Sequence, residues 1–189
     1  MPSRVHQVID THGSLVFPGV YDPLSAKIAE QTGFPLAFVS GYAVAATLLG
    51  EPDLGLLTQT EIIERARQIC RAVSIPILVD ADTGYGNALN IVRTVTELVG
   101  TGAAGCFLED QQWPKRCGHM DGKRVVDRQE YLEKIGAAVE ARGEADFFVV
   151  ARTDAVAAVG LDEALARVDG ARAAGADATF VEAPRSLAE

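Results

Sequence analysis

The chain has 189 residues, of which 48% are hydrophobic and 23% charged, a composition typical of globular domains with a real core. Its 17 Lys and Arg residues and 26 Asp and Glu residues leave a formal net charge of −9. This acidic balance argues against nucleic acid as a partner, because nucleic-acid binding depends on Lys and Arg, and no polybasic tract suits a membrane surface.

The three cysteines, Cys70, Cys106 and Cys117, contain no C-x-x-C pair. Cys70 falls in a helical pattern and Cys106 in an apolar run, so we expect reduced thiols and a cytoplasmic protein. Residues 1–4 include no apolar stretch of the kind that a secretory signal needs, so no such signal is expected.

Residues 31–50 carry no charge and are long enough to cross a membrane as a helix. Pro35 and the Ser40-Gly41 pair interrupt this stretch, and no basic flank follows it. We therefore expect a strand followed by a long loop, and no membrane as a partner.

Short apolar runs alternate with helical patterns along the chain. The first run contains Pro18 and Gly19, and the strands are predicted at 15–21, 36–39, 75–79, 105–108, 147–151 and 178–181. Asp22-Pro23 and the capping box of Thr58 with Glu61 predict two helix starts. The helices are predicted at 22–32, from 58, and at 88–99, 127–141 and 161–174.

Strand–helix alternation with short connections predicts parallel strands buried on both faces. An open doubly wound sheet and a (β/α) barrel both fit, although no G-x-G-x-x-G follows the first strand. A barrel needs eight strands and typically about 250 residues. We therefore expect one incomplete (β/α)₈ TIM-type barrel domain over residues 1–189, with about six βα units and the last quarter missing.

Every predicted strand after the first ends in polar residues. In a parallel barrel these ends share the face that holds active sites. The clusters are Ser40-Gly41, Asp80 and Asp82, Glu109 and Asp110, Arg152 and Asp154, and Glu182.

The Asp80-x-Asp82 pair follows a buried strand, and strand alternation would put both carboxylates on one side. Together with Asp53 and Glu109 they form an all-oxygen set that suits Mg²⁺, which takes one or two direct carboxylates and keeps several waters. The alternative is that both aspartates only cap the turn that leads to Gly84.

The loop after the fourth strand contains Lys115-Arg116-Cys117-Gly118-His119. A thiol beside two cations and an imidazole can exchange protons near neutral pH. A nucleophilic Cys–His pair, a zinc site, for which Cys-x-His is too tight, and a structural loop with an incidental cysteine are the alternatives.

Arg152 at a strand end suits bidentate capture of a carboxylate, and its alternative is a structural ion pair with Asp154 or Glu182. Ser40 and the amides that follow it could form an anion nest. His6 and His12 are expected to be solvated.

Seven motifs occur together in an order and spacing that resemble the isocitrate lyase/phosphoenolpyruvate mutase superfamily over residues 15–185. They are Ser40-Gly41-Tyr42, Glu51-Pro52-Asp53-Leu54-Gly55, Asp80-Ala81-Asp82-Thr83-Gly84-Tyr85-Gly86-Asn87, Glu109-Asp110-Gln111, Lys115-Arg116-Cys117-Gly118-His119, Ala151-Arg152-Thr153-Asp154 and Val181-Glu182-Ala183-Pro184. The segments 47–53 and 112–119 look most similar to the dimethylmalate lyase and petal death protein branch, which includes oxaloacetate hydrolases.

The resemblance implies a (β/α)₈ barrel that binds α-oxycarboxylates with Mg²⁺, or Mn²⁺ in its place, and breaks a C–C or P–C bond. By match, Asp80 would ligate the metal, and Asp82, Glu109 and Asp53 would hold its waters. Substrate would be bound by Ser40, Gly41, Tyr42 and Arg152. Cys117 would protonate the departing carbon, with His119 and Glu182 in support, and a loop at 111–126 with hinges at Gly118 and Gly122 would close over it.

Two departures qualify this resemblance. Phe38 stands where methylisocitrate lyases have a tyrosine, and the seventh-strand Asn motif and the final helix, exchanged between partners, are not found. The expected activity is cleavage of a 2-hydroxy di- or tricarboxylate to a 2-oxo acid and a simple acid, in a homo-oligomer (a dimer of dimers). The alternatives are an oxaloacetate hydrolase or decarboxylase, a phosphonopyruvate-type P–C enzyme, and an inactive truncated barrel.

Overall fold

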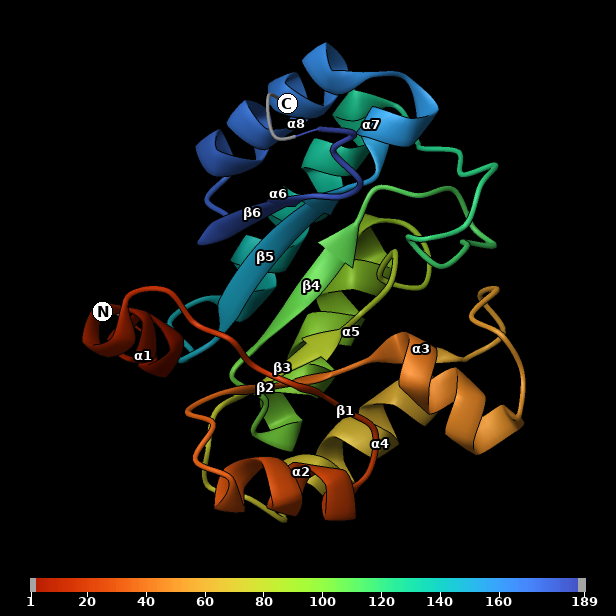
Figure 1. Ribbon diagram of the computed structural model, residues 1–189. Helices are drawn as coiled ribbons and strands as arrows, with labels where there is room; N and C mark the ends of the chain where they lie inside the picture. Colours follow the sequence, from red (N-terminus) through yellow and green to blue (C-terminus); the bar gives the residue numbers. More distant parts are fainter. Residues whose placement is uncertain (1–2, 187–189) are drawn as a thin grey trace.

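The computed structural model describes residues 3–186, which form a parallel six-stranded sheet with helices packed along it (Figure 1). The strands follow one another in chain order across the sheet, and β1 and β6 are its two edges, so the described sheet is not closed. The strands are β1 Gly19–Val20, β2 Ala37–Val39, β3 Ile77–Asp80, β4 Gly105–Glu109, β5 Phe148–Thr153 and β6 Ala178–Val181. The predicted fold class, an α/β barrel of six units that remains incomplete, is confirmed.

The first strand is much shorter than the prediction of 15–21. Pro18 has no amide to donate to a neighbouring strand, although its carbonyl accepts a hydrogen bond from Phe38 N at 3.0 Å. Leu15 and Phe17 leave the sheet and pack on its inner face instead. Strand pairing therefore begins only at Gly19.

The helices α2 to α5 begin at side-chain caps, whereas α6 to α8 begin without one. Asp22 caps α2 and Pro23 is its first residue, while Thr58 and Glu61 form the expected capping box of α4. The helices are α1 Arg4–His12, α2 Pro23–Gln31, α3 Gly41–Val44, the π-helix η1 Ala45–Leu49, α4 Gln59–Cys70, α5 Ala88–Thr101, α6 Arg128–Arg142, α7 Ala155–Ala158 and α8 Leu161–Ala173.

Four short elements differ from the sequence-based expectation. Helix α1 was not predicted, and the long loop expected after β2 begins with α3 and η1, which the uninterrupted apolar run conceals because it has no helical period. Helix α7 is only one turn long. Within residues 3–186, none of the helices has the length and apolar character needed to cross a membrane.

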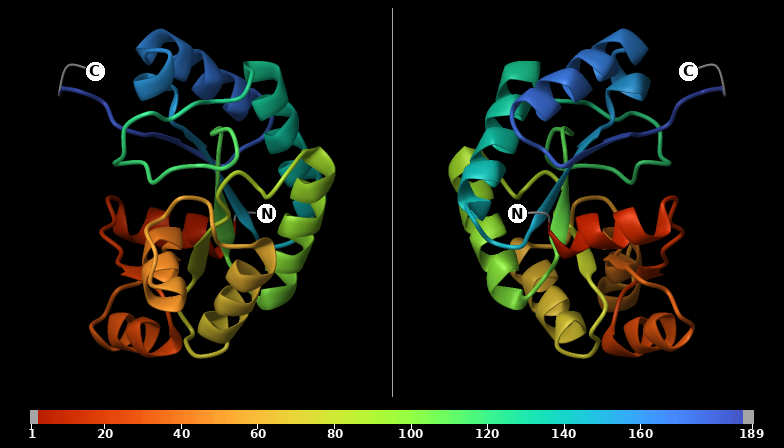
Figure 2. Two further views of the ribbon diagram at one scale, coloured as in Figure 1. Left: turned by 90° about the vertical axis from the view of Figure 1, so that its right-hand side faces the viewer. Right: turned by 90° about the vertical axis from the view of Figure 1, so that its left-hand side faces the viewer.

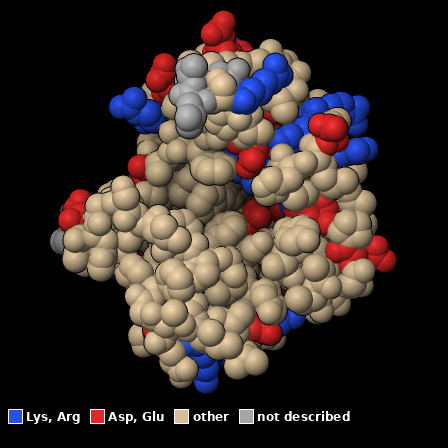
Figure 3. All heavy atoms as spheres, viewed as in Figure 1, with Lys and Arg blue, Asp and Glu red and all other residues tan. Residues whose placement is uncertain are grey.

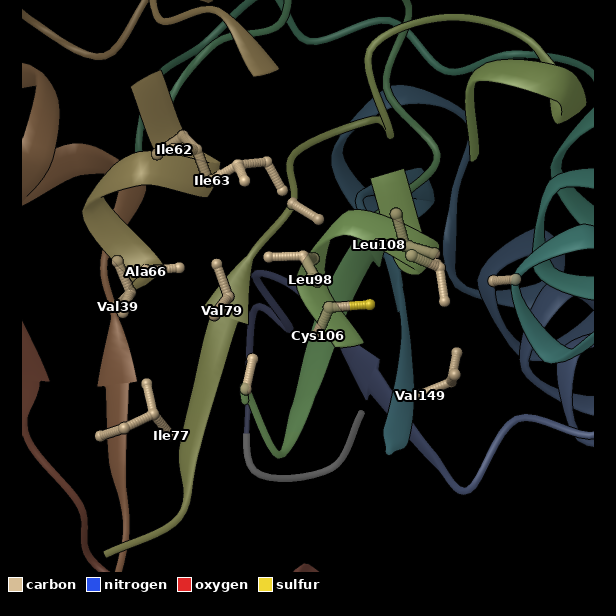
Figure 4. Close-up of a cluster of buried hydrophobic side chains, with 14 of the residues drawn as sticks. Val39, Ile62, Ile63, Ala66, Ile77, Val79, Leu98, Cys106, Leu108 and Val149 are labelled. Carbon is tan, nitrogen blue, oxygen red and sulfur yellow. The ribbon is translucent and has the colours of Figure 1, made fainter. Parts of the chain in front are cut away.

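The outer face of the sheet carries the larger core. Strand alternation turns Ile77, Val79, Cys106, Leu108 and Val149 toward the helices, where they pack against side chains of α4 and α5 (Figure 4). Figure 2 shows these helices standing in a row along one side of the sheet. All three cysteines are free thiols, as was expected for Cys70 and Cys106, and Cys106 is fully buried in this core.

The inner face carries a smaller core, closed at the amino ends of the strands by α1. Val5 of α1 packs with Leu36, Leu78, Phe148 and Val150. The expectation that His6 is solvated holds only in part, because its side chain is 36% exposed but also makes contacts. Its Nδ1 lies 2.8 Å from Ser3 Oγ in the helix cap, and its ring packs edge-on against Phe148. The opposite, carboxyl end of this inner face is free of α1.

Candidate active site

The carboxyl ends of the strands gather polar side chains on the inner face of the sheet. Alternation turns Phe107 and Glu109 of β4 inward, and parallel pairing places Glu109 directly beside Arg152 of β5. Asp80 is the last residue of β3, and Glu182 follows β6 directly. Figure 3 shows a hollow across this side of the molecule with acidic side chains in its wall.

Asp80 and Asp82 meet at the start of α3. A methyl group added to Gly41 would lie 2.9 Å from Asp80 Oδ2 and 3.5 Å from Asp82 Oδ1, so both carboxylates lie close to Gly41. The expected reason, strand alternation, is wrong for Asp82. This residue lies beyond β3 with φ of 49°, and its amide donates to Asp80 Oδ1 at 3.1 Å. The tight turn, and not the strand, brings the pair together.

Lys115 places an ammonium group between two of the predicted metal-site acids. Its Nζ lies 2.6 Å from Asp53 Oδ2 and 2.7 Å from Asp82 Oδ1, and all three side chains are buried. Burial outweighs the attraction of Lys115 and raises the pKa of Asp82 to about 6. The carboxylates in turn raise the pKa of Lys115, although burial opposes this shift.

Glu109 is the least satisfied of these acids. Its Oε1 is buried and has no hydrogen-bond partner among the described residues, while Oε2 lies 3.5 Å from Arg152 Nε. Burial raises the pKa of Glu109 well above its ordinary value, although Arg152 and Lys115 oppose the shift. An unpartnered buried carboxylate oxygen is free to accept a hydrogen bond or to ligate an ion.

Arg152 lies within ion-pair distance of three acids. Its Nε and Nη2 donate to Asp154 at 3.0 and 3.1 Å, and Nη2 lies 3.3 Å from Glu182 Oε2. The alternative of a structural ion pair is therefore present in the structure. It also fixes the guanidinium in one orientation at the inner edge of the site, beside the Phe180 ring.

The loop between β4 and α6 brings Cys117 to this edge. The amide of Cys117 donates to Asp53 O at 3.0 Å, and Cys117 Sγ lies 3.6 Å from His119 Nδ1. Lys115 turns to the acids and Arg116 to Asp121 O, so the imidazole is the polar group found in contact with the thiol.

Gly118 is wedged against Arg152. A methyl group at this position would lie 2.4 Å from Arg152 Nη2 and 2.9 Å from Glu182 Cδ. The loop therefore lies directly on the guanidinium predicted to bind a carboxylate, and Gly118 is the residue type that allows this approach.

The predicted anion nest is occupied by this chain's own groups. Ser40 caps α3, with its Oγ accepting from Ala43 N at 3.3 Å, and the Gly41 amide donates to Asp80 Oδ2 at 3.3 Å. Tyr42 is exposed at 57% of its surface. Ser40 and Gly41 lie beside the acids, whereas Tyr42 points to solvent.

Two residues at the site were missed from the sequence. Tyr85 donates to Asp82 Oδ2 at 2.9 Å, and Lys123 Nζ lies 2.9 Å from Asp154 Oδ1. Tyr85 is part of a quoted motif and could have been proposed. The Lys123 contact joins positions 31 residues apart, so no local spacing indicates it.

A divalent cation fits this donor set by its chemistry. The donors are carboxylate oxygens, one of them without a partner, as hard cations prefer. Within the described residues, no three His, Cys, Asp or Glu side chains are arranged to enclose an ion directly. Mg²⁺, with one or two direct carboxylates and several waters, suits such an open arrangement.

The family described as phosphoenolpyruvate phosphomutase matches residues 6–189. The chain belongs to the phosphoenolpyruvate mutase/isocitrate lyase superfamily. Among its members, the chain is 57% identical over 187 residues to the "Carboxyvinyl-carboxyphosphonate phosphorylmutase, chloroplastic" of Arabidopsis thaliana, covering 97% of this chain and 55% of the relative. It is 55% identical to the petal death protein of Dianthus caryophyllus, covering 99% and 59%.

Solved structures of superfamily members show the same arrangement. A 2,3-dimethylmalate lyase superposes with a TM-score of 0.92 at 39% identity, covering 97% of this chain and 62% of that one. An oxaloacetate acetylhydrolase in complex with 3,3-difluorooxalacetate gives 0.93 at 39% identity, covering 97% and 63%. The chain thus spans about 55–65% of the length of the relatives it matches.

Proposed function

We propose that this chain carries the metal- and carboxylate-binding edge of a carbon–carbon lyase that acts on 2-hydroxy di- or tricarboxylates. The products would be a 2-oxo acid and a simple carboxylic acid. The observation that carries the proposal is the contact of the Cys117-Gly118 loop with Arg152 beside a row of buried carboxylates. Lyases named among the relatives, such as the 2,3-dimethylmalate lyase of Eubacterium barkeri at 44% identity, support it.

Arg152 would bind the substrate carboxylate. Its guanidinium is held by Asp154 and Glu182, which leaves little freedom to lose on binding. Ser40 and Gly41 lie near Asp80 and would complete the substrate contacts. Tyr42, exposed on α3, would have to turn inward to contribute.

Asp80 would ligate Mg²⁺ directly, and Asp53, Asp82 and Glu109 would hold it through water. When bound, Mg²⁺ (or Mn²⁺) supplies a Lewis acid that stabilises negative charge on the 2-oxygen and the carboxylate. A structure of phosphonopyruvate hydrolase with oxalate and Mg²⁺, which superposes at a TM-score of 0.86 and 33% identity, supports this choice of metal.

Cys117 would deliver the proton to the departing fragment. As the hydroxyl loses its proton and becomes a carbonyl, the C–C electrons leave with the simple acid, whose carbon takes the thiol proton. The hydroxyl proton finally restores the thiol, so the reaction needs no other reagent. His119, 3.6 Å from the sulfur, and Glu182 would support this exchange.

Hydrolysis of oxaloacetate is the second candidate, favoured by the close superposition on oxaloacetate acetylhydrolase. Its hydrate carries a hydroxyl beside a carboxylate, as the lyase substrate does, so the same groups would bind it. P–C bond chemistry is the alternative suggested by the 57% identity to the carboxyvinyl-carboxyphosphonate phosphorylmutase. The Cys117 thiol beside His119, which can protonate a departing carbon, favours C–C cleavage over it.

The test is release of 2-oxo acid from 2-alkylmalates and methylisocitrate, of oxalate and acetate from oxaloacetate, and of phosphate from phosphonopyruvate, in Mg²⁺ or in EDTA. We expect Mg²⁺-dependent oxo acid from one of the hydroxy acids. Phosphate from phosphonopyruvate would overturn the lyase assignment. No turnover of any substrate, by protein whose intact mass matches the gene product, would favour the inactive barrel.

The cytoplasmic location, the homo-oligomer and the single barrel domain over residues 1–189 remain proposals. Cell fractionation tests the first, and sedimentation of the purified protein tests the second. A single cooperative unfolding transition would support the third.

A further inference from the structure

Lys123 is buried although it lies in a surface loop and has a long charged side chain. Its ammonium donates to Gly118 O at 2.6 Å and to Asp154 Oδ1 at 2.9 Å. Buried lysines are rare unless they are paired, so both contacts must offset the loss of water. The side chain thus ties the loop that carries Cys117 to the residue that follows β5.

Asp154 is held rigidly on the other side of this tie. Its amide donates to Asp110 Oδ1 at 2.8 Å, and both of its carboxylate oxygens accept from the Arg152 guanidinium. Asp110 is itself paired with Arg167 of α8 at 3.0 Å. The same carboxylate therefore orients Arg152 and receives Lys123.

The two partners of Lys123 are Gly118, the residue next to Cys117, and Asp154, which holds Arg152. Gly118 rests against Arg152 and Glu182 so closely that no methyl group fits between them. If the Lys123 ammonium is lost, the Gly118 carbonyl and Asp154 each lose a charge-assisted hydrogen bond. Lys115 then remains as the second buried lysine that pins the loop to the acids.

We propose that Lys123 is a positioning residue. Its contacts with Gly118 and Asp154 act as a latch, which holds the loop over the site and keeps Cys117 at a fixed position relative to Arg152. Its ammonium does not touch the reacting atoms; it acts through Gly118 and Asp154. The catalytic meaning of the latch rests on the proposed lyase function, whereas the latch itself does not.

The test compares Lys123→Met with Lys134→Met, both in a Cys70→Ser background that leaves Cys117 as the accessible thiol. Lys134 is also buried but pairs with Glu130 of its own helix, so it is a matched control. Alkylation of Cys117 by iodoacetamide without substrate reports loop opening. We expect K123M to be alkylated about tenfold faster, as loss of bonds to a charged group implies, and K134M to react like the parent.

Lys123→Arg should restore slow alkylation, because a guanidinium can still bridge a carbonyl and a carboxylate. In the assay of the proposed function, we expect kcat/KM of K123M to fall about tenfold and that of K134M to change less than twofold. If K123M loses its cooperative unfolding transition, Lys123→Gln, which keeps a polar group at this position, takes its place.

Alkylation of a folded K123M or K123Q protein at the parent rate would overturn the latch, whatever the activity. Faster alkylation in a chain whose parent turns over no substrate would leave the latch standing and remove the proposed function. Faster alkylation with unchanged kcat/KM would show a latch that does not position Cys117, which also overturns the proposal.

Discussion

The two ends of the sheet differ in how deeply their charged side chains are buried. At the carboxyl end, Lys115 and its partners Asp53 and Asp82 are almost fully buried. At the amino end, Arg4 and Asp146 form an ion pair with side chains 39% and 51% exposed. Buried ion pairs are weak contributors to stability, so a cluster of them indicates selection for something other than stability.

The amino end uses its polar groups to fix the fold. Asp177 accepts from Val149 N at 2.8 Å and pairs with Arg142, and Arg4 donates to Gly102 O at 2.7 Å. Each of these contacts joins two elements of the fold near their ends. The carboxyl end instead places like charges together and leaves one oxygen of Glu109 without a partner.

Among the changes that distinguish the carboxyl end from the amino end, removal of the Cys117 thiol should have the largest effect. Cys117→Ser should lower kcat on the preferred hydroxy acid by about 100-fold or more, because a hydroxyl is a far weaker proton donor at neutral pH. The urea midpoint should stay near that of the parent, since the side chain is only partly buried. Cys70→Ser is the control, and equal turnover by the two variants would contradict the role of Cys117.

Removal of one positively charged side chain should lower the free energy of unfolding much more at the carboxyl end than at the amino end. Lys115→Met leaves Asp53 and Asp82 buried without a partner and should lower the free energy of unfolding by about 3–5 kcal/mol. Arg4→Met, at the amino end, should cost no more than about 1 kcal/mol, because its ion pair is exposed. Urea unfolding of both variants measures the difference, and equal losses would remove the distinction.

A smaller change tests the approach of the loop to Arg152. Gly118→Ala should lower kcat/KM by about 10- to 100-fold, because the new methyl group cannot lie 2.4 Å from Arg152 Nη2 and the loop must shift. Gly100→Ala in α5, where nothing lies within 4 Å, is the control. Unchanged kinetics of G118A would mean that the loop works in a more open position.

The smallest effect concerns acid stability away from the site. Hydrogen bonds from Arg128, and then from Arg167, lower the pKa of Glu163 to about 2. A carboxyl whose folded pKa is depressed stabilises the fold above its unfolded pKa, here 4.5, and this contribution is lost as pH falls toward 2. Glu163→Gln should therefore flatten the decline of unfolding free energy between these values. Asp162→Asn, on the same first turn, should keep the slope of the parent.

Most of the fold could be predicted because its signals are local. The Thr58 and Glu61 cap and the apolar runs at β3 to β6 each lie within a few residues, and the structure keeps them. Helix α1 was missed because its cap joins Ser3 to His6 and not to an acidic residue. The run from Gly41 to Leu49 lacks the polar positions that would indicate a helix.

The site could be predicted as a set of residues but not as a set of contacts. Strand ends fixed where Asp80, Glu109 and Arg152 would lie, since parallel pairing is regular. Asp53 lies 62 residues from Lys115 and Asp154 lies 31 residues from Lys123, so the roles of both lysines depend on the path of a loop. From spacing alone, Lys115 was assigned to the surroundings of Cys117, and Lys123 was given no role.

The most direct test of the central claim is calorimetric titration of oxalate, a small dicarboxylate, into the protein with and without Mg²⁺. We expect binding only with Mg²⁺, its loss in Asp80→Asn, and its retention in Asp146→Asn, which removes an acid at the other end of the sheet. Binding that ignores Mg²⁺, or that survives in D80N, would contradict a metal-assisted carboxylate site at the carboxyl ends of these strands.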